Sequence, residues 1–151
     1  MSGRSKNTEW YADGLRFSCT QCGNCCTGPP GFVWFTDDEA AALADRFDMT
    51  VREFRKMYAR KIDGGWSLGE VETEHGFDCI FLDRSTGAGR CSVYEDRPTQ
   101  CRTWPFWPEN LRTERTWELV KRQTPCPGMG AGTLVPIEQI RIIRDQQTGE
   151  P

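Results

Sequence analysis

The sequence predicts an α+β fold: a small, irregular single domain of short strands and a few helices, organised around one or more thiolate metal centres. Three observations favour this fold. Short apolar runs bounded by Gly and Pro are typical of short strands. Two capping boxes, at Thr36 and Thr50, precede apolar residues at helical spacing. Eight cysteines, four of them within residues 19–26, are too concentrated to be explained by packing.

The composition is that of one domain with a small, aromatic core. A chain of 151 residues buries about two-thirds of its unfolded surface. Apolar residues make up only 37%, but six Trp and eight Phe supply large rings. We expect an N-terminal arm over residues 1–16, a metal-binding domain over 17–147 and a tail over 148–151. The formal charge of −3, made more negative by metal-bound thiolates, disfavours a nucleic-acid partner.

The first elements are a strand and a helical hairpin. Residues 27–31 contain two Gly and two Pro, which predict a rigid turn before a strand over 32–35. Thr36 and Thr50, each followed three residues later by Glu, begin two helices that we expect to pack as a hairpin. The second helix and its continuation carry basic residues that form either a solvated face or a docking surface for an acidic partner or phosphate: Arg52, Arg55, Lys56, Arg60 and Lys61.

The middle of the chain predicts hairpins. Residues 62–75 combine turn glycines with an alternating stretch and predict an exposed hairpin. Residues 78–82 and 89–94 predict two paired strands that each carry one cysteine. Pairing would bring Cys79 and Cys91 close enough to share a metal centre.

The last third of the chain predicts two helices and a strand. Pro98 is suited to a first helical position, so a short helix holds Cys101 in its first turn, where the helix dipole favours a thiolate. Residues 113–120 alternate loosely and predict a strand, and residues 136–145 predict a helix. Residues 128–132 weakly resemble a nucleotide-binding loop, but no preceding strand or P-loop lysine supports it.

The cysteines are the candidate metal ligands. Steps of three between Cys19, Cys22 and Cys25 let one loop or helical turn direct thiolates at a single zinc ion or iron–sulfur cluster. Neighbours in an extended segment point to opposite sides, so we expect Cys25 and Cys26 to serve different centres; in the alternative, one ligates and the other is buried. Eight thiols suit two four-thiolate centres, or one centre with spare thiols. The full set is Cys19, Cys22, Cys25, Cys26, Cys79, Cys91, Cys101 and Cys126.

Other side chains near these cysteines have alternative roles. The only histidine, His75, is expected at the surface because eight thiols already suffice, although it could complete a centre. Arg97 and Arg102 either offset thiolate charge, or bond carbonyls or Glu95.

A disulfide scaffold is the alternative to metal binding. Adjacent cysteines and short spacings would need several very short disulfide loops at once, whereas metal ligation suits such crowding. The N-terminal residues lack the apolar stretch of a secretory signal, so we expect a reducing, cytoplasmic location. No segment is expected to span a membrane.

These motifs resemble the CxxCxxCC family of zinc- or iron-chelating proteins, the YkgJ-type cysteine-cluster proteins, over residues 17–133. The resemblance rests on the eight cysteines in order, together with Val93-Tyr94, Arg97-Pro98, Trp104-Pro105-Phe106 and Pro127-Gly128. It implies metal chelation, and such proteins are often described as Fe–S oxidoreductases. The motif also occurs in flagellin lysine N-methylases, whose extra length is missing here, so the resemblance does not carry methylase activity over.

Two classes of function follow. The first is an iron–sulfur protein, preferably with a [4Fe–4S] cluster, a redox or modification role and a protein redox partner. The second is a structural zinc protein that acts as a partner-binding module. The C-x2-C-x2-C run favours iron because bacterial ferredoxins use the same run. In ferredoxins three residues separate this run from the next cysteine, whereas here Cys26 follows Cys25 directly. One histidine and the absence of paired carboxylate motifs leave no independent catalytic motif.

Overall fold

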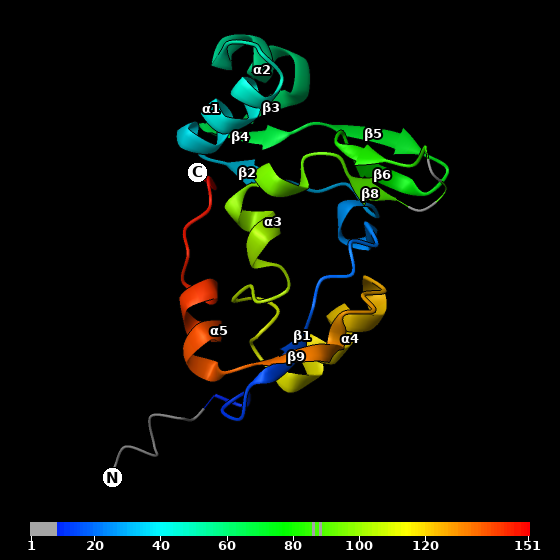
Figure 1. The fold of residues 1–151 in the computed structure, drawn as a ribbon, viewed down its shortest axis with the longest axis vertical. Coiled ribbons are helices and arrows are strands. Elements are labelled where there is room, and N and C mark those ends of the chain that lie inside the picture. Colours follow the sequence, from blue (N-terminus) through cyan, green and yellow to red (C-terminus); the bar gives the residue numbers. More distant parts are fainter. Residues whose placement is uncertain (1–8, 86, 88) are drawn as a thin grey trace. The chain divides into compact units, whose positions relative to one another are not determined.

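The computed structural model describes residues 9–85, 87 and 89–151, which form short strands and short helices (Figure 1). The prediction of an α+β fold is therefore confirmed. The chain forms two compact units. The central unit comprises Gly23–Arg102 and Gln147–Pro151, and the terminal unit comprises the described residues up to Cys22 together with Thr103–Gln146. Of the expected N-terminal arm, residues 1–8 lie outside the described residues.

The helical hairpin of the central unit forms as expected. Helices α1 (Asp37–Arg46) and α2 (Val51–Tyr58) follow one another along the chain (Figure 1). Both begin with complete capping boxes. Their buried side chains, with Phe54 and Leu43 fully enclosed, form one side of the unit's core. Met57, near the end of α2, is 61% exposed.

Small antiparallel sheets complete the central unit. A three-stranded sheet has the order β2-β4-β3, and two further pairs are β5-β6 and β7-β8. The strands are β2 (Trp34–Phe35), β3 (Ala59–Ile62), β4 (Gly65–Leu68), β5 (Glu70–Thr73), β6 (Gly76–Cys79), β7 (Leu82–Asp83) and β8 (Arg90–Cys91). The single hairpin expected at 62–75 is thus divided between two hairpins. The chain changes partner at Gly69, whose N–H donates to the Tyr58 carbonyl at 2.7 Å.

Cys79 and Cys91 do not lie on paired strands, which corrects the expected hairpin. Cys79 on β6 faces Glu70 on β5, whereas Cys91 on β8 faces Leu82 on β7. β6, the strand that carries Cys79, pairs with the preceding strand β5 because a tight turn joins the two.

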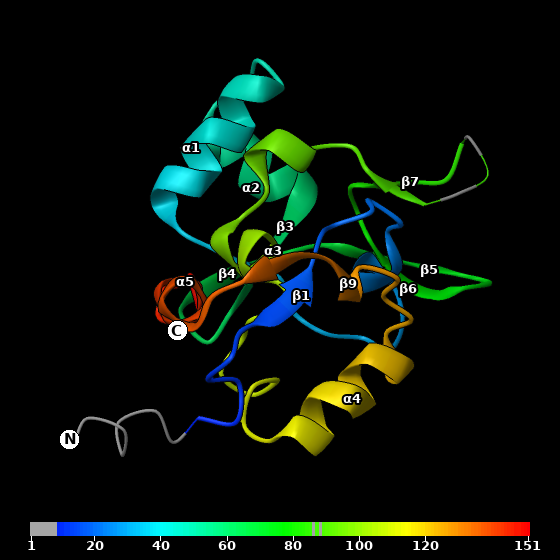
Figure 2. The ribbon, with the colours of Figure 1, turned by 60° about the horizontal axis from the view of Figure 1, so that its bottom comes forward.

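The terminal unit is built on a strand pair from the two ends of the chain. β1 (Leu15–Phe17) pairs antiparallel with β9 (Met129–Val135), as Figure 2 shows in blue and orange. The core of this unit includes Tyr11, Trp117 and Ile140. Since residues 129–135 form a strand, the resemblance of residues 128–132 to a nucleotide-binding loop has no structural counterpart.

One element of the terminal unit was predicted wrongly. Residues 113–120 were expected as a strand, but α4 (Glu114–Gln123) is a helix. Its N-cap is Thr113, whose hydroxyl accepts a hydrogen bond from the Thr116 N–H at 3.0 Å. The three-residue step from Trp117 to Val120 places both on the core side, a helical pattern mistaken for alternation.

The remaining helices follow the prediction. α3 (Thr99–Thr103) begins directly after Pro98, and α5 (Ile137–Arg144) buries Ile137 and Ile140. Two 3-10 turns, η2 (Asn24–Cys26) and η3 (Tyr94–Asp96), lie in the central unit. None of the described helices is long and apolar enough to cross a bilayer.

Candidate metal centre

The cysteines are divided between the two units. The central unit holds Cys25, Cys26, Cys79, Cys91 and Cys101, and the terminal unit holds Cys19, Cys22 and Cys126. None of the eight, all within the described residues, forms a disulfide. The disulfide scaffold considered as an alternative is therefore not adopted.

Cys25 and Cys26 lie together in the 3-10 turn η2 and are hydrogen-bonded through their side chains. The expectation that they point to opposite sides is wrong, because neighbours in a 3-10 turn diverge by about 120° and not 180°. The hydrogen bond from Cys26 lowers the pKa of Cys25 to about 7. The same hydrogen bond raises the pKa of Cys26, and burial is the second largest cause of that increase. The two thiols are therefore chemically unequal.

Gly23 lets this turn approach the strand that carries Cys91. Its φ of 78° lies in the left-handed region that favours glycine. A Cβ at Gly23 would lie 2.7 Å from the carbonyl carbon of Gly89, two residues before Cys91. A side chain at this position would push the turn away from β8.

The other three thiols of the central unit are close enough to influence one another electrostatically. Burial, with smaller contributions from the charges of Cys91, Glu70 and Cys25, raises the pKa of Cys79 to about 11. Burial also raises the pKa of Cys91 and, most strongly, that of Cys101. These groups are neutral thiols near pH 7, so binding of a metal cation would release their protons.

A buried carboxylate ties two cysteine segments together. Asp78 is 4% exposed and accepts hydrogen bonds from the Thr27 hydroxyl and from Arg84, whose Nε lies 2.6 Å from Oδ2. Arg84, assisted by Thr27, holds the pKa of Asp78 at about 2, so the carboxylate stays charged. Because Thr27 follows Cys26 and Asp78 precedes Cys79, this network fixes the two thiols in the same region.

A second carboxylate anchors the helix of Cys101. Glu39 uses Oε1 to accept from the Thr36 N–H at 2.8 Å, which completes the capping box of α1. Its Oε2 accepts from both the N–H and the hydroxyl of Thr99 at 2.6 Å. Thr99 is the first residue of α3, so Glu39 positions Cys101 two residues later. The sequence indicated only the capping role, since nothing in it marks a partner 60 residues away.

Arg97, which precedes α3, and Arg102, which lies within it, have different surroundings. Burial raises the pKa values of Cys91 and Cys101, and the positive charge of Arg97 opposes both shifts. The Arg97 guanidinium also lies 3.7 Å from the centre of the Tyr94 ring. Arg102 instead donates to the Arg97 carbonyl and lies 3.6 Å from Glu39. Of the pair, Arg97 is the one whose charge acts on the thiols.

The terminal unit brings Cys19 towards Cys126 through its strand pair. Phe17 faces Met129, and the Ser18 N–H donates to the Gly128 carbonyl at 3.3 Å, which extends the pairing beyond the two strands. Cys19 and Cys126 therefore leave the same end of the β1–β9 ladder. Cys19 accepts a hydrogen bond from the Gln21 N–H at 3.4 Å.

The donor set fits a thiophilic metal. Four sulfurs bound to one zinc ion lie about 3.8 Å apart, given a Zn–S bond of about 2.3 Å. Within residues 9–85, 87 and 89–151, no three Cys, His, Asp or Glu side chains are placed to hold one ion. The His75 side chain is 48% exposed and lies 3.5 Å from Glu74.

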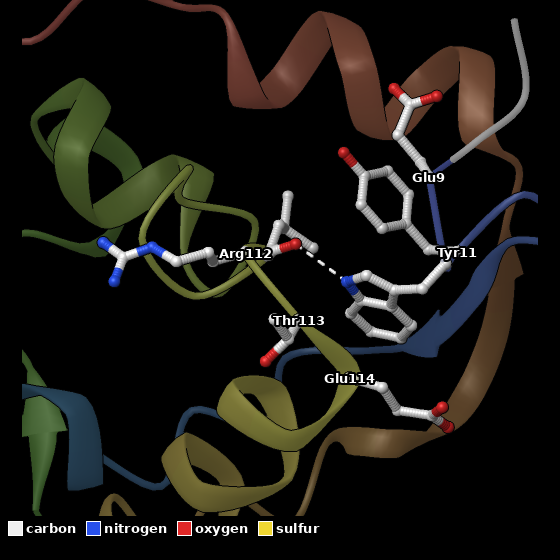
Figure 3. A pocket seen from close by; sticks show the side chains of 7 residues that line it. Glu9, Tyr11, Arg112, Thr113 and Glu114 are labelled. Carbon is white, nitrogen blue, oxygen red and sulfur yellow. Dashed lines mark hydrogen bonds between the residues drawn. The ribbon is translucent and has the colours of Figure 1, made fainter.

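Two pockets of the described residues are lined without cysteines. One, of 440 Å³, lies in the terminal unit around Trp10, whose indole N–H donates to the Leu111 carbonyl at 2.8 Å (Figure 3). Arg112 and Glu114 also line it, while Glu9 is bound to Arg141 at 2.6 Å. The other, of 310 Å³, lies in the central unit between Met57 and Phe77. No cysteine lines either pocket.

Short strands and helices that gather five thiols in one unit define a cysteine-rich α+β protein. The chain belongs to the CxxCxxCC family: the family model, described as "Putative zinc- or iron-chelating domain", matches residues 18–127. This confirms the resemblance drawn from the cysteine motifs.

The chain is also similar to an uncharacterized protein of Methanocaldococcus jannaschii. The two are 32% identical over 106 residues, which cover 70% of this chain and 53% of the relative. The chain therefore spans about half the length of that relative. No solved structure matches the chain.

Proposed function

We propose that the chain is an iron–sulfur protein whose central unit holds a cluster, [4Fe–4S] in preference, for a redox or modification reaction. The observation that carries this proposal is the gathering of thiols in the central unit. Cys25, Cys79, Cys91 and Cys101 lie close enough to influence one another electrostatically, and a [4Fe–4S] cluster needs four thiolates. In a [4Fe–4S] cluster each thiolate binds a different iron, so the four sulfurs lie farther apart than around zinc.

Four of the central thiols would be the ligands: Cys25, Cys79, Cys91 and Cys101. Cys25 is suited to lose its proton first, because the hydrogen bond from Cys26 lowers its pKa to about 7. Cys26 would then remain as a hydrogen-bond donor to the Cys25 sulfur. Hydrogen bonds to ligand sulfurs adjust the reduction potential of such centres.

The surrounding residues would hold the ligands and balance their charge. Asp78 fixes the Cys26 and Cys79 segments through Thr27, and Glu39 fixes the start of α3. Arg97 supplies a positive charge that opposes the raised pKa values of the buried thiols. The bound cluster would supply one-electron transfer. Eight thiols without a disulfide suit the reducing cytoplasm.

Anaerobic purification followed by absorption spectroscopy tests this function. An iron–sulfur cluster absorbs broadly at about 400 nm, and reduction with dithionite bleaches the band. A colourless protein that contains zinc without sulfide would contradict the proposal and favour a structural zinc protein that binds a partner.

A further inference from the structure

We infer that the central unit carries a docking surface for an acidic protein segment with an apolar anchor, beside the Cys79 strand. The inference deepens the proposed function, because it assigns the chemical character of the partner that would exchange electrons with the centre. Its binding test does not depend on which metal is bound.

The surface begins with a groove, here called the Met57 groove. It encloses 310 Å³ and is lined by Met57, Tyr58, Arg60, Glu70, Phe77 and Ile80. Met57 is 61% exposed at the C-terminal end of α2, although a methionine side chain is largely apolar. Polarizable, flexible methionines adapt to varied apolar partners. The groove therefore suits one apolar anchor side chain.

Basic residues lie on α2 and on the strand that follows it. Arg52 and Lys56 lie four residues apart on α2, so they share one face of that helix. Both are exposed and have no ion-pair partner among the described residues. Arg60, on the following strand, lines the groove and lies 3.2 Å from Glu70. The acid of α2, Glu53, is occupied by the capping box with Thr50.

The groove and Cys79 share one face of the β5–β6 pair. Glu70 faces Cys79 across the ladder, and Glu72 faces Phe77. Directly opposed residues point to the same side of a sheet, and so do residues two apart on one strand. Glu70 and Phe77 therefore line the groove from the face that carries the Cys79 thiol. A partner seated there would lie on the same face of the β5–β6 pair as a candidate ligand.

The combination of charge and shape indicates the occupant. The unpaired basic pair lies on α2, the helix whose last residues, Met57 and Tyr58, line the groove. Electrostatic complementarity selects partners and increases association rates, and a buried apolar anchor supplies most of the affinity. A polyanion without apolar groups would use the basic pair and leave the groove empty. An acidic protein segment uses both.

Fluorescence anisotropy on the full, metal-loaded chain tests the inference. The probe is a labelled synthetic peptide whose central Phe-Leu pair is flanked on both sides by Asp and Glu. We expect saturable binding that weakens with salt. Lys56→Glu should raise the dissociation constant by about tenfold, and Met57→Ser, which leaves the charge unchanged, by about fivefold. Arg122→Glu, an equal charge reversal on exposed α4, is the matched control and should leave binding unchanged.

Several results would overturn the docking surface. Absence of saturable binding would do so, as would equal losses in Lys56→Glu and Arg122→Glu. Equal binding of a peptide with Gly in place of Phe-Leu would show attraction by charge alone. Lys56-dependent self-association in light scattering would assign the surface to a second copy, and Lys56-dependent binding to phosphatidylserine vesicles without peptide binding would assign it to a lipid surface. A zinc-containing chain that still binds the peptide would retain the docking surface and refute only the iron–sulfur proposal.

Discussion

At the scale of single residues, Cys25 and Cys26 have different chemistry although they are neighbours. Their shared turn directs both thiols into one region, and the hydrogen bond makes Cys25 the stronger acid. Spacing in the sequence identified both as ligand candidates. It could not reveal their orientation, because that depends on the local turn, which Gly23 allows through its positive φ.

The first prediction separates the two thiols. Cys25→Ser should remove the metal of the central unit, because it deletes the most readily ionised thiol. Cys26→Ser should keep the metal and shift its absorption spectrum, since the serine hydroxyl still donates a hydrogen bond. Metal analysis and spectra of the two purified variants provide the measurement. Equal metal loss in both would show that Cys26 is itself a ligand.

Glu9 provides a pH-dependent prediction in the terminal unit. Its carboxylate lies 2.6 Å from Arg141 and 3.2 Å from Arg144. Hydrogen bonds from these two side chains, the larger contribution coming from Arg141, lower the pKa of Glu9 from 4.5 to about 2. Because the pKa of Glu9 is lower in the folded chain than in the unfolded chain, its ion pairs stabilise the fold fully at pH values above the unfolded-state pKa of 4.5. This stabilisation disappears as the pH falls towards 2.

Glu9→Gln should therefore lower the free energy of unfolding by about 1–2 kcal/mol at pH 7, a figure reduced for partial exposure. The difference from the wild type should shrink between pH 4.5 and about 2. Urea unfolding at several pH values measures it, with the exposed Glu109→Gln as control. A difference that does not change with pH would contradict the assignment to these ion pairs.

At the scale of elements, the two capping boxes were predictable and their wider roles were not. Both boxes follow from a short local motif, and both helices begin where that motif places them. Glu39 also holds the start of α3, a contact that only the folded chain creates. Helix α4 was missed for the opposite reason: its short amphipathic pattern is ambiguous locally, and packing of Trp117 in the core decides it.

Glu39 and Glu53 form a matched pair for a prediction. Each completes a capping box, but only Glu39 also bonds Thr99 at the start of the Cys101 helix. Glu53→Ala should cost about 1 kcal/mol of stability and leave the metal content unchanged. Glu39→Ala should cost about 2 kcal/mol and also lower the metal content, because Cys101 loses its support.

Thermal unfolding and metal analysis of both variants provide the comparison. Equal metal content in the two proteins would show that Glu39 does not position Cys101.

At the scale of the whole molecule, contacts between residues far apart in the sequence determine which of the eight cysteines belong to each unit. The β1–β9 pair joins residues over 100 positions apart and brings Cys19 and Cys126 to one end of a ladder. No local pattern encodes such a pairing, so the sequence could predict the ligand types but not their division into three and five.

Metal removal should destabilise the folded chain. Because the thiols become ligands only when they are brought together by folding, the free energy of metal binding also stabilises the fold. A strong chelator should lower the melting temperature by at least about 5 °C, a shift that corresponds to one to two kcal/mol. Circular dichroism melts with and without chelator measure it. An unchanged melt would show that the metal does not contribute to stability.

The most direct test is the content of iron, zinc and acid-labile sulfide per chain after anaerobic purification, in the wild type and in Cys101→Ser. A [4Fe–4S] centre in the central unit predicts about four iron and four sulfide per chain, with both greatly reduced by Cys101→Ser. Thr99→Ser, which keeps the hydroxyl bound by Glu39, should retain the wild-type content. Zinc without sulfide in the wild type, or an iron and sulfide content unaffected by Cys101→Ser, would contradict the account.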